Sequence, residues 1–429
     1  MKISEFAGIA KLASAKLSSL TSEVKNDALR AISASLIENK NEIFQANFID
    51  MKNGEAEGLL APILKRLRFD EDKLSEVLKG IDSLISLEDP VGKTLKVTEL
   101  DEDLILHKVS CPIGVIGVIF ESRPDALIQI STLCLKSGNS ALLKGGSEAI
   151  ETNRVLARII EESSVCHGIP NGWLHLLEKR QDVMEMLSCD DSIDLLIPRG
   201  SNEFVKYIMN NTKIPVMGHA DGICHCYVDK FADLDMAIRV VVDSKTQYVA
   251  VCNATETLLI HQEIAESFLP RIFQSLKEKN VKIHGCNITR TIIPVEIANE
   301  ETYSTEYLDY EISIKVVTDI DDAINHINKF GSGHTDAIIT EDTKRAECFM
   351  VLVDSGNVFV NCSTRFSDGF RYGFGAEVGI STSKLHARGP VGLEGLMIYK
   401  YKLYGKGHIV DDYSEDRKHF THRDLSNRV

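Results

Sequence analysis

One cysteine lies in a sequence setting that suits chemistry. The segment QYVAVCNATETLLIH, residues 247–261, places Cys252 between an apolar run and the polar Asn253, with a strand-like run after it. A free cysteine is most often a small buried hydrophobe. A thiol that surfaces at a strand end beside a polar neighbour can instead act as a nucleophile. Cys252 is therefore a candidate nucleophile, with packing residue and metal ligand as the alternatives.

The other cysteines give little support for a metal site. In a long intracellular chain, ten cysteines are more often reduced thiols than a disulfide framework. The segment GICHCYV brings Cys224, His225 and Cys226 together. On a strand, however, the two cysteines share one face and His225 points to the other. A second Cys/His pair at zinc-finger spacing is also missing, so we predict no metal.

The elements that must position Cys252 alternate between strand and helix. Residues 1–90 repeat apolar residues every three or four positions, which predicts helices. Residues 92–111 alternate in two short runs about an acidic turn, which predicts a hairpin. From residue 113 on, apolar runs such as IGVIGVIF and SALLKGG alternate with helical segments, and a second such block begins near Tyr227. This alternation predicts parallel sheets with helices on both faces.

Length and composition limit the class of protein. The chain has 429 residues, more than one hydrophobic core usually holds, so two domains are expected. A net charge of −15 argues against binding to nucleic acid or to an acidic membrane, and it means that an anionic substrate needs a locally basic pocket. The N-terminus lacks the apolar core of a secretory signal, and no run approaches the ~18 apolar residues of a membrane span. We therefore expect a cytoplasmic protein.

Four long segments together resemble a known family. They are GVIGVIFESRPDALIQISTLCLKSGNSALLKGG, VCNATETLL, NCSTRFSDG and FGAEVGISTSKLHARGPVGLEGL, in this order. They are similar to segments of the γ-glutamyl phosphate reductases, aldehyde-dehydrogenase-like enzymes of proline biosynthesis. The resemblance extends over about residues 5–410. It implies an α/β, aldehyde-dehydrogenase-like fold with two parallel-sheet domains and a small β oligomerisation element.

The resemblance also implies how the chain is divided. The strand near 396–405 has no obvious partner inside the chain, so we expect it to pair with a neighbouring subunit, which would cover an open edge. The charged tail 409–429 is expected to be mobile. The implied parts are an NADP-binding domain at 1–226 with a return segment at about 362–392, a catalytic domain at 227–361 that carries Cys252, and an oligomerisation hairpin and strand at 92–111 and 393–408.

The reaction and its nucleophile follow from the same resemblance. Enzymes of this family reduce L-glutamate 5-phosphate with NADPH to L-glutamate 5-semialdehyde and release phosphate, and their nucleophile matches Cys252. Attack by the thiolate gives a thioester, which divides one difficult step into two easier ones. Hydride transfer then creates an oxyanion that needs fixed donors. The backbone N–H of Cys252 is the expected first donor, and Ser122 and Asn253 are candidates for the second. The alternative for Ser122 is to cap the helix that begins at Pro124.

One absence favours the reductive direction. Oxidising aldehyde dehydrogenases carry a glutamate that activates water against the thioester. The matching segment here is GHADGICH, which has no glutamate and has His219 near that position. A reductase must keep water away from the thioester, so the lack of this base fits. We expect His219 either to contact the substrate or to be a structural histidine.

The sequence lacks the G-x-G-x-x-G fingerprint after its first buried strand, which agrees with the aldehyde-dehydrogenase mode of cofactor binding. By the resemblance, LLKGGSE would contact the adenosine ribose. Lys144 would attract a 2′-phosphate and Ser147 would not repel it, so NADP is favoured over NAD. The family often has a basic residue at 147, and its absence leaves the strength of this preference open. Gly200 and Ser201 would contact the nicotinamide end or the pyrophosphate. Glu306 would hold the nicotinamide ribose, with an exposed carboxylate as its alternative.

Arginines are the expected ligands of the substrate's phosphoryl and carboxylate groups, because their planar fork binds such anions in a bidentate way. Arg123, Arg365 and Arg388 lie in the family segments, with Lys384 behind them. The sequence does not decide which arginine takes which anion. Asp125 stands where the family usually has asparagine, so we expect it to point away or to pair with Arg123.

The remaining polar residues of these segments leave alternatives open. Asp368 or Glu377 could take the substrate ammonium group. The same two residues could instead let Arg365 brace the glycine-rich loop that follows it.

The expected partners are the small-molecule substrate, other copies of this chain and, transiently, glutamate 5-kinase. Neither nucleic acid nor membrane is expected as a partner. Two rival functions are an aldehyde dehydrogenase that works in the oxidative direction and a catalytically silent protein of the same fold. GHADGICH argues against the first, and the intact Cys252–Asn253 pair with the arginine-bearing STRF loop argues against the second.

Overall fold

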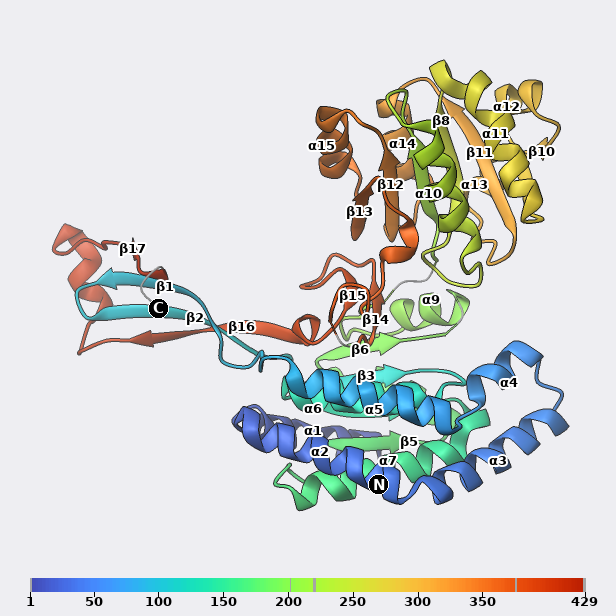
Figure 1. Cartoon of the computed structure of the whole chain (residues 1–429). Helices are drawn as coiled ribbons and strands as arrows, with labels where there is room; N and C mark the ends of the chain where they lie inside the picture. Colours follow the sequence, from blue (N-terminus) through green and yellow to red (C-terminus); the bar gives the residue numbers. More distant parts are fainter. Residues whose placement is uncertain (1, 201, 219–220, 375, 427–429) are drawn as a thin grey trace.

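The computed structural model describes residues 2–200, 202–218, 221–374 and 376–426. It has two lobes and an arm that projects from them (Figure 1). The lower lobe in Figure 1 contains a four-stranded parallel sheet, and the upper lobe contains a seven-stranded parallel sheet. The arm is a four-stranded antiparallel sheet. The predicted arrangement of two parallel-sheet lobes and a small β element is therefore confirmed.

The first sheet consists of strands buried on both faces, as their continuous apolar runs predict. Every residue of its two central strands is buried. Its strands, in the order β5-β4-β3-β6, are β5 (Leu174–Leu177), β4 (Ser140–Lys144), β3 (Val115–Ile119) and β6 (Leu195–Pro198). The helices of this lobe are α1 (Ile3–Leu17), α2 (Ser22–Glu38), α3 (Lys40–Ala56), α4 (Ala61–Leu67), α5 (Glu71–Ser86), α6 (Pro124–Ser137), α7 (Ile150–Cys166), α8 (Arg180–Leu187) and α9 (Asn202–Asn210).

The second sheet begins earlier in the chain than expected. The boundary placed between residues 226 and 227 falls inside a strand that pairs on both sides with strands of this sheet. In the order of the sheet, the strands are β10 (Glu296–Ile297), β9 (Lys282–Gly285), β11 (Glu311–Val317), β8 (Thr255–His261), β7 (Cys224–Val228), β12 (Thr335–Ile339) and β13 (Asn357–Val360). The helices are α10 (Leu234–Thr246), α11 (Ala265–Glu278), α12 (Asn287–Ile292), α13 (Glu300–Tyr303), α14 (Ile320–Phe330) and α15 (Thr343–Leu352).

After the second sheet the chain returns to the first lobe. Strands β14 (Gly379–Ser381) and β15 (Gly389–Val391) form a small antiparallel pair, which lies between the two lobes in Figure 1. Val378 and Val391 pack in the same core as residues of β3 and β4. The return segment therefore joins the two lobes at the level where their sheet edges meet.

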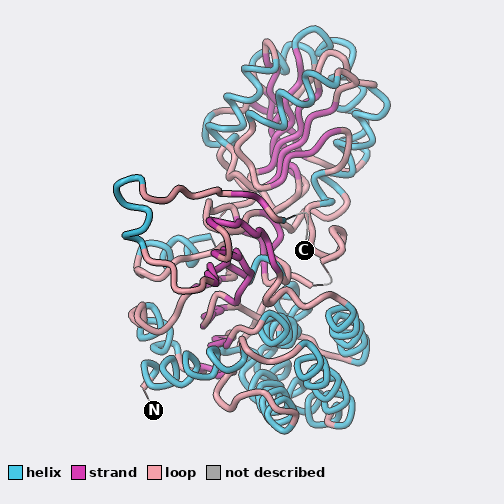
Figure 2. Tube along the Cα trace, turned by 90° about the vertical axis from the view of Figure 1, so that its left-hand side faces the viewer, coloured by secondary structure: helices cyan, strands magenta, loops and turns pink. Residues whose placement is uncertain are grey.

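The arm corrects one expectation from sequence. Strands β1 (Thr94–Asp101) and β2 (Leu104–Pro112) form the predicted hairpin. The late strand β16 (Met397–Tyr404) does have a partner inside the chain, because it pairs along its whole length with β2. Figure 2 views the molecule from the side of the arm. Within the described residues, β16 is the outer strand of this sheet, so its other edge is open.

The charged tail is a second correction, because it folds onto the arm. Strand β17 (Arg423–Asp424) pairs with β1. The N–H of Thr421 donates to the carbonyl of Leu100 at 2.8 Å, and the N–H of Leu425 donates to the carbonyl of Val97 at 2.9 Å. These bonds satisfy backbone groups along the edge of β1, which gives a polar segment a reason to be ordered.

None of the helices in the described ranges is long and apolar enough to cross a membrane.

We predict that Arg423→Glu releases the tail, because Arg423 Nη2 lies 2.6 Å from the Glu99 carboxylate and a second carboxylate there would repel it. Each lost backbone bond contributes about 1 kcal/mol net. The melting temperature should fall by about 2–4 °C per kcal/mol lost, and the chain should self-associate through the exposed edge of β1. Light scattering and thermal melts measure both effects. Lys213→Glu makes the same charge change on an exposed loop, and an equal effect there would contradict the prediction.

Candidate active site

Cys252 lies in the turn between α10 and β8, where the N–H of Ala254 donates to the carbonyl of Val251 at 3.1 Å. The thiol is partly exposed. In a parallel sheet the amino ends of all strands meet at one edge, so the segments before β7, β11 and β12 lie near this turn. The loops after β3, β4 and β6 come from the carboxyl edge of the first sheet. The two edges meet, because Asn202 Nδ2 donates to Glu306 Oε2 at 3.0 Å.

The segment GHADGICH passes directly against the nucleophile. A Cβ on Gly222 would lie 2.4 Å from both the Cα and the carbonyl oxygen of Cys252, so no larger residue fits there. Two residues later, the Cys224 thiol donates to the carbonyl of Cys252 at 3.2 Å. His219, expected near this point, lies outside the described residues. The segment GHADGICH, which contains no glutamate, therefore packs against Cys252 through Gly222 and Cys224.

Asn253 joins the nucleophile's turn to the return segment. Its Nδ2 donates to the carbonyl of Ser367 at 2.7 Å, and Thr364 Oγ1 donates to the carbonyl of Asn253 at 2.8 Å. The side chain is buried, with one N–H engaged by Ser367. Its second N–H is the one that could serve as the expected oxyanion donor.

Ser122 does not have the helix-cap role considered above. Helix α6 has Arg123 at its N-cap position, with no capping side-chain bond. Both the N–H and the Oγ of Ser122 instead donate to Glu148 Oε1, at 2.6 and 2.5 Å. These bonds hold Ser122 at a φ of 41°, in the left-handed region that few non-glycine residues adopt. Glu148 follows Ser147 in the expected ribose segment, so the two loops are bonded together.

Sequence reasoning missed Arg199, which stands directly after β6. Burial lowers the pKa of its guanidinium, and the neighbouring charge of Arg123 lowers it further. The Cys252 thiol and the carboxylates of Glu377 and Asp125 act in the opposite direction. A basic residue at the carboxyl end of a buried parallel strand was the available signal. Arg123 Nη2 lies 3.6 Å from the Asp125 carboxylate, so of the two alternatives for Asp125 the structure has the pairing with Arg123.

Arg365 is a second basic group close to the nucleophile. Only 8% of it is exposed, and its Nε donates to Gln247 Oε1 at 2.9 Å. Burial lowers its pKa, and the charge of Arg371 adds to this effect. Cys252 and Asp368 oppose the lowering.

The glycine-rich loop that follows Arg365 is held by other residues. Glu377 accepts from the N–H of Gly369 at 2.8 Å, and Arg371 Nη1 donates to the carbonyl of Arg365 at 2.8 Å. Arg371 also lies 3.7 Å from the Asp368 carboxylate.

Arg388 is bonded elsewhere. Its Nη1 and Nη2 donate to the carboxylate and the carbonyl of Asp354, at 2.8 and 3.0 Å. Lys384, the basic residue considered behind it, binds the same carboxylate at 2.5 Å. This pairing gives Arg388 a structural role beyond the end of α15, in contrast to the arginines whose charges interact with Cys252.

Lys144 ends β4 in a partly acidic environment. Burial lowers its pKa, while Glu148, Asp182 and Glu178 oppose this effect. Ser147 is exposed and begins a short 3-10 turn. Lys144 could therefore meet a phosphate only in competition with three carboxylates.

The nicotinamide end was expected at Gly200, Ser201 and Glu306. Ser201 lies outside the described residues. Its neighbour Asn202 donates through Nδ2 to Glu306 and to Asp221, at 3.0 and 2.8 Å. Glu306 is therefore brought to the loop that begins at Gly200, although the two are far apart in sequence.

Comparisons with known proteins agree with this geometry. The aldehyde dehydrogenase family model matches residues 2–285. A γ-glutamyl phosphate reductase of Acetivibrio thermocellus is 65% identical over 426 residues, which cover 99% of this chain and 99% of that protein. The chain belongs to the γ-glutamyl phosphate reductases of the aldehyde dehydrogenase family. One of Pelotomaculum thermopropionicum is 62% identical, with 99% of this chain and 98% of that protein covered.

Solved structures confirm the aldehyde-dehydrogenase-like fold. The crystal structure of γ-glutamyl phosphate reductase from Thermotoga maritima has a TM-score of 0.93 at 39% identity, covering 95% of this chain and 100% of that chain. An acetylating aldehyde dehydrogenase from Geobacillus thermoglucosidasius has a TM-score of 0.64 at 17% identity, covering 95% and 97%. The second likeness extends to the fold alone.

In this member of the γ-glutamyl phosphate reductase family, Cys226 and His225 lie on opposite faces of β7, as strand alternation predicts. On β7, Cys226 packs in the core shared with α10 and α11. His225 points to the other face, where its Nδ1 lies 2.9 Å from the Asp336 carboxylate. Within the described ranges, no group of three or more His, Cys, Asp or Glu side chains is placed to hold a metal ion.

We predict that Gly222→Ala displaces the turn that carries Cys252, because the new methyl group has no space. Such overpacking typically costs about 1–3 kcal/mol. The melting temperature should fall, and the rate of Cys252 alkylation, followed by mass spectrometry, should change. Gly218→Ala is the matched control, because a Cβ there meets the carbonyl of Pro198 at an ordinary 3.5 Å. Equal behaviour of the two variants would contradict the prediction.

Proposed function

We propose that this protein reduces L-glutamate 5-phosphate with NADPH to L-glutamate 5-semialdehyde and releases phosphate, as a step of proline biosynthesis. The observation that carries the proposal is the place of Cys252 where the two sheet edges meet, with Arg199 and Arg365 close enough for Cys252 to influence their pKa values. The full-length identity to curated γ-glutamyl phosphate reductases supports the same reaction.

In the proposed reaction the Cys252 thiolate attacks the acyl carbon of the substrate. The bond from that carbon to the phosphate oxygen breaks, and phosphate leaves with the electron pair. The product is a thioester held on Cys252. A bound nicotinamide cofactor supplies the hydride that reduces this thioester. The resulting oxyanion then collapses, the carbon–sulfur bond breaks, and the aldehyde leaves as the thiolate re-forms.

The oxyanion needs donors that are already in place, since losing one typically costs ~3 kcal/mol. The backbone N–H of Cys252 is the first in this proposal. Asn253 is better placed than Ser122 for the second, because its second N–H is available, whereas the Ser122 hydroxyl donates to Glu148. We therefore assign Ser122 the role of holding the loop that carries Arg123.

Water must be kept from the thioester for the reduction to succeed. In the described part of GHADGICH the one carboxylate is Asp221. It is bonded to Asn202 and, at 2.8 Å, to Lys206. This supports the reductive direction over the oxidative one. A substrate contact by His219 remains part of the proposal.

The loops at the carboxyl edge of the first sheet fit a dinucleotide, which binds at such edges. They approach closely, since a Cβ on Gly200 would lie 3.1 Å from the Glu121 carboxyl carbon. Lys144 and Ser147 would hold the adenosine ribose and its 2′-phosphate, Gly200 and Ser201 the pyrophosphate or nicotinamide end, and Glu306 the nicotinamide ribose. We propose NADPH over NADH, with a preference weakened by the carboxylates around Lys144.

We assign the substrate anions to Arg123, Arg199 and Arg365, and the ammonium group to Glu377 or Asp368. Burial raises the pKa of Glu377, and the arginines Arg199 and Arg123 oppose this effect. Arg388 is left out of the substrate group because of its bonds to Asp354.

The proposal also includes a cytoplasmic location, a homo-oligomer and a transient contact with glutamate 5-kinase. The open edge of β16 and the exposed side chains of Tyr399, Tyr401 and Leu403 on it support association between copies of the chain.

We predict that Cys252→Ser abolishes turnover while melting temperature and NADPH affinity stay nearly unchanged, because serine is a far weaker nucleophile without a base. The assay is the reverse reaction, with glutamate semialdehyde, phosphate and NADP, followed by NADPH absorbance. Cys362→Ser is the matched control, since this partly buried cysteine lies in the return segment. Wild-type turnover in Cys252→Ser would defeat the mechanism. Wild-type turnover without phosphate would favour the oxidative rival.

We predict that Arg365→Ala raises the KM for phosphate or for the semialdehyde by at least about 100-fold, since a buried charge left without its partner costs ~3–5 kcal/mol. The KM for NADP should stay unchanged. A rise for phosphate alone would assign Arg365 to the leaving group, and a rise for the semialdehyde alone to the α-carboxylate. Arg388→Ala should leave every KM unchanged. A lowered melting temperature with unchanged KM values in Arg365→Ala would make Arg365 a structural residue.

A further inference from the structure

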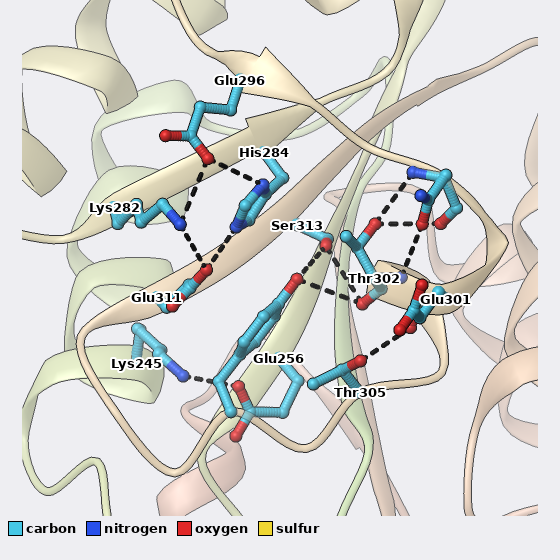
Figure 3. Close-up of polar contacts among 12 residues, drawn as sticks. Lys245, Glu256, Lys282, His284, Glu296, Glu301, Thr302, Thr305, Glu311 and Ser313 are labelled. Carbon is cyan, nitrogen blue, oxygen red and sulfur yellow. Dashed lines mark hydrogen bonds and ion pairs between the residues drawn. The ribbon is translucent and has the colours of Figure 1, made fainter.

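A fully buried ion pair lies on the two elements that flank the nucleophile's turn. Lys245 near the end of α10 donates through Nζ to Glu256 Oε2 at 2.6 Å, and both side chains are 0% exposed. Glu256 is the second residue of β8, so the residues between the two include Cys252. Figure 3 shows the two side chains directed toward each other. The pair therefore closes the base of the turn.

The same pair contacts the segment that contains Glu306. The backbone N–H of Leu308 lies close enough to the Glu256 carboxylate to lower its pKa, and Leu308 has a φ of 53°. The ring of Tyr307 lies with its centroid 5.9 Å from Lys245 Nζ. Backbone and ring contacts thus tie two consecutive residues of this segment to the ion pair.

Further bonds fix Tyr307 in turn. Its hydroxyl contacts Ser313 Oγ at 2.9 Å and donates to the carbonyl of Thr302 at 3.2 Å. Its ring stacks on His284 at a centroid distance of 5.8 Å. His284 is itself held by the Glu311 carboxylate (Figure 3). The Glu306 segment is thus anchored to the second sheet on one side and to the ion pair on the other.

Stability alone does not account for such a pair, because replacing a buried ion pair by apolar residues is often neutral or stabilising. Within the described residues, Glu256 Oε1 has no hydrogen-bond partner. Burial raises the pKa of Glu256 to about 7, against the opposing effect of Lys245. A fully buried, incompletely bonded pair beside the nucleophile therefore calls for a role in placing the groups around it.

We propose that Lys245 and Glu256 are positioning residues, which keep the Cys252 turn and the Glu306 segment at a fixed separation. The inference rests on the proposed function, because it assigns this separation to the hydride step. Cys252 lies in the turn that the pair closes. The Glu306 carboxylate, which accepts a hydrogen bond from Asn202 of the first lobe, lies in the segment that the pair contacts. A shift of about 1 Å between reacting groups can slow a reaction about 100-fold.

The test uses the double variant Lys245→Met/Glu256→Gln. It removes both charges, so neither remains buried without a partner, and it keeps an acceptor for the N–H of Leu308. Enzyme mixed rapidly with semialdehyde and NADP, without phosphate, gives a burst of NADPH absorbance that reports the hydride step. We expect this burst to slow about 100-fold, with unchanged alkylation of Cys252 by iodoacetamide and a melting temperature above that of Lys245→Met alone.

The matched control is the double variant Arg345→Met/Asp229→Asn. Asp229 is also 0% exposed and lies 2.6 Å from Arg345, but it follows β7 at the opposite end of the sheet from Cys252. Its burst rate should equal that of the wild type. A wild-type burst in Lys245→Met/Glu256→Gln, or an equal loss in the control, would overturn this inference alone. Absence of a burst in the wild type would overturn it together with the proposed function.

Discussion

The site depends on how little space surrounds the turn that carries Cys252. The Gly222 backbone packs against one side of it, and the return segment bonds to Asn253 on another. The pair Lys245–Glu256 closes its base. Packed interiors transmit small displacements because they contain few voids. Cys252 is therefore placed by two segments from other parts of the chain and by an ion pair on its own flanking elements. This explains why a loop between a helix and a strand can hold a nucleophile with precision.

The charge around this turn is positive, although the chain as a whole is acidic. The protein carries a net charge of −15, yet Arg123, Arg199 and Arg365 gather near Cys252. Burial lowers the pKa of Arg199 and of Arg365. A cation held in a poorly solvated place interacts more strongly with an anion that arrives there than it would in water. In the proposed function, this local positive charge would let an acidic protein accept an acidic substrate.

Local patterns in the sequence predicted local structure well. Apolar runs marked the strands of both parallel sheets, and the hairpin at 92–111 follows from its alternation. Non-local pairing was harder. The partner of β16, strand β2, lies far away in sequence. A charged tail is predicted to be mobile unless it is known that a strand edge is open for it to pair with, as the edge of β1 is. The boundary at residue 226 cut through β7, because the sequence alone does not show that this short strand pairs with β8 and β12.

The candidate site shows the same division. Motif residues such as Cys252, Arg365 and Glu306 were proposed from sequence, whereas Arg199 was passed over in favour of the residues that follow it. Ser122 was considered an oxyanion donor or a helix cap, and its bond to Glu148 was not foreseen because it depends on how two loops approach each other. Arg388 looked equal to Arg365 because a sequence does not reveal that Asp354 lies beside it.

The arm has a consequence for how the chain is made. Its hairpin leaves the ribosome early, but the strands that flank it, β16 and β17, come from the last part of the chain. With synthesis at about 5–20 residues per second, roughly 15–60 s pass before both flanking strands exist. During that time the nascent hairpin has two unprotected edges. Such edges can pair wrongly with other nascent chains on the same messenger RNA. Completion of the arm therefore lags well behind the synthesis of its hairpin, because β16 and β17 must be translated first.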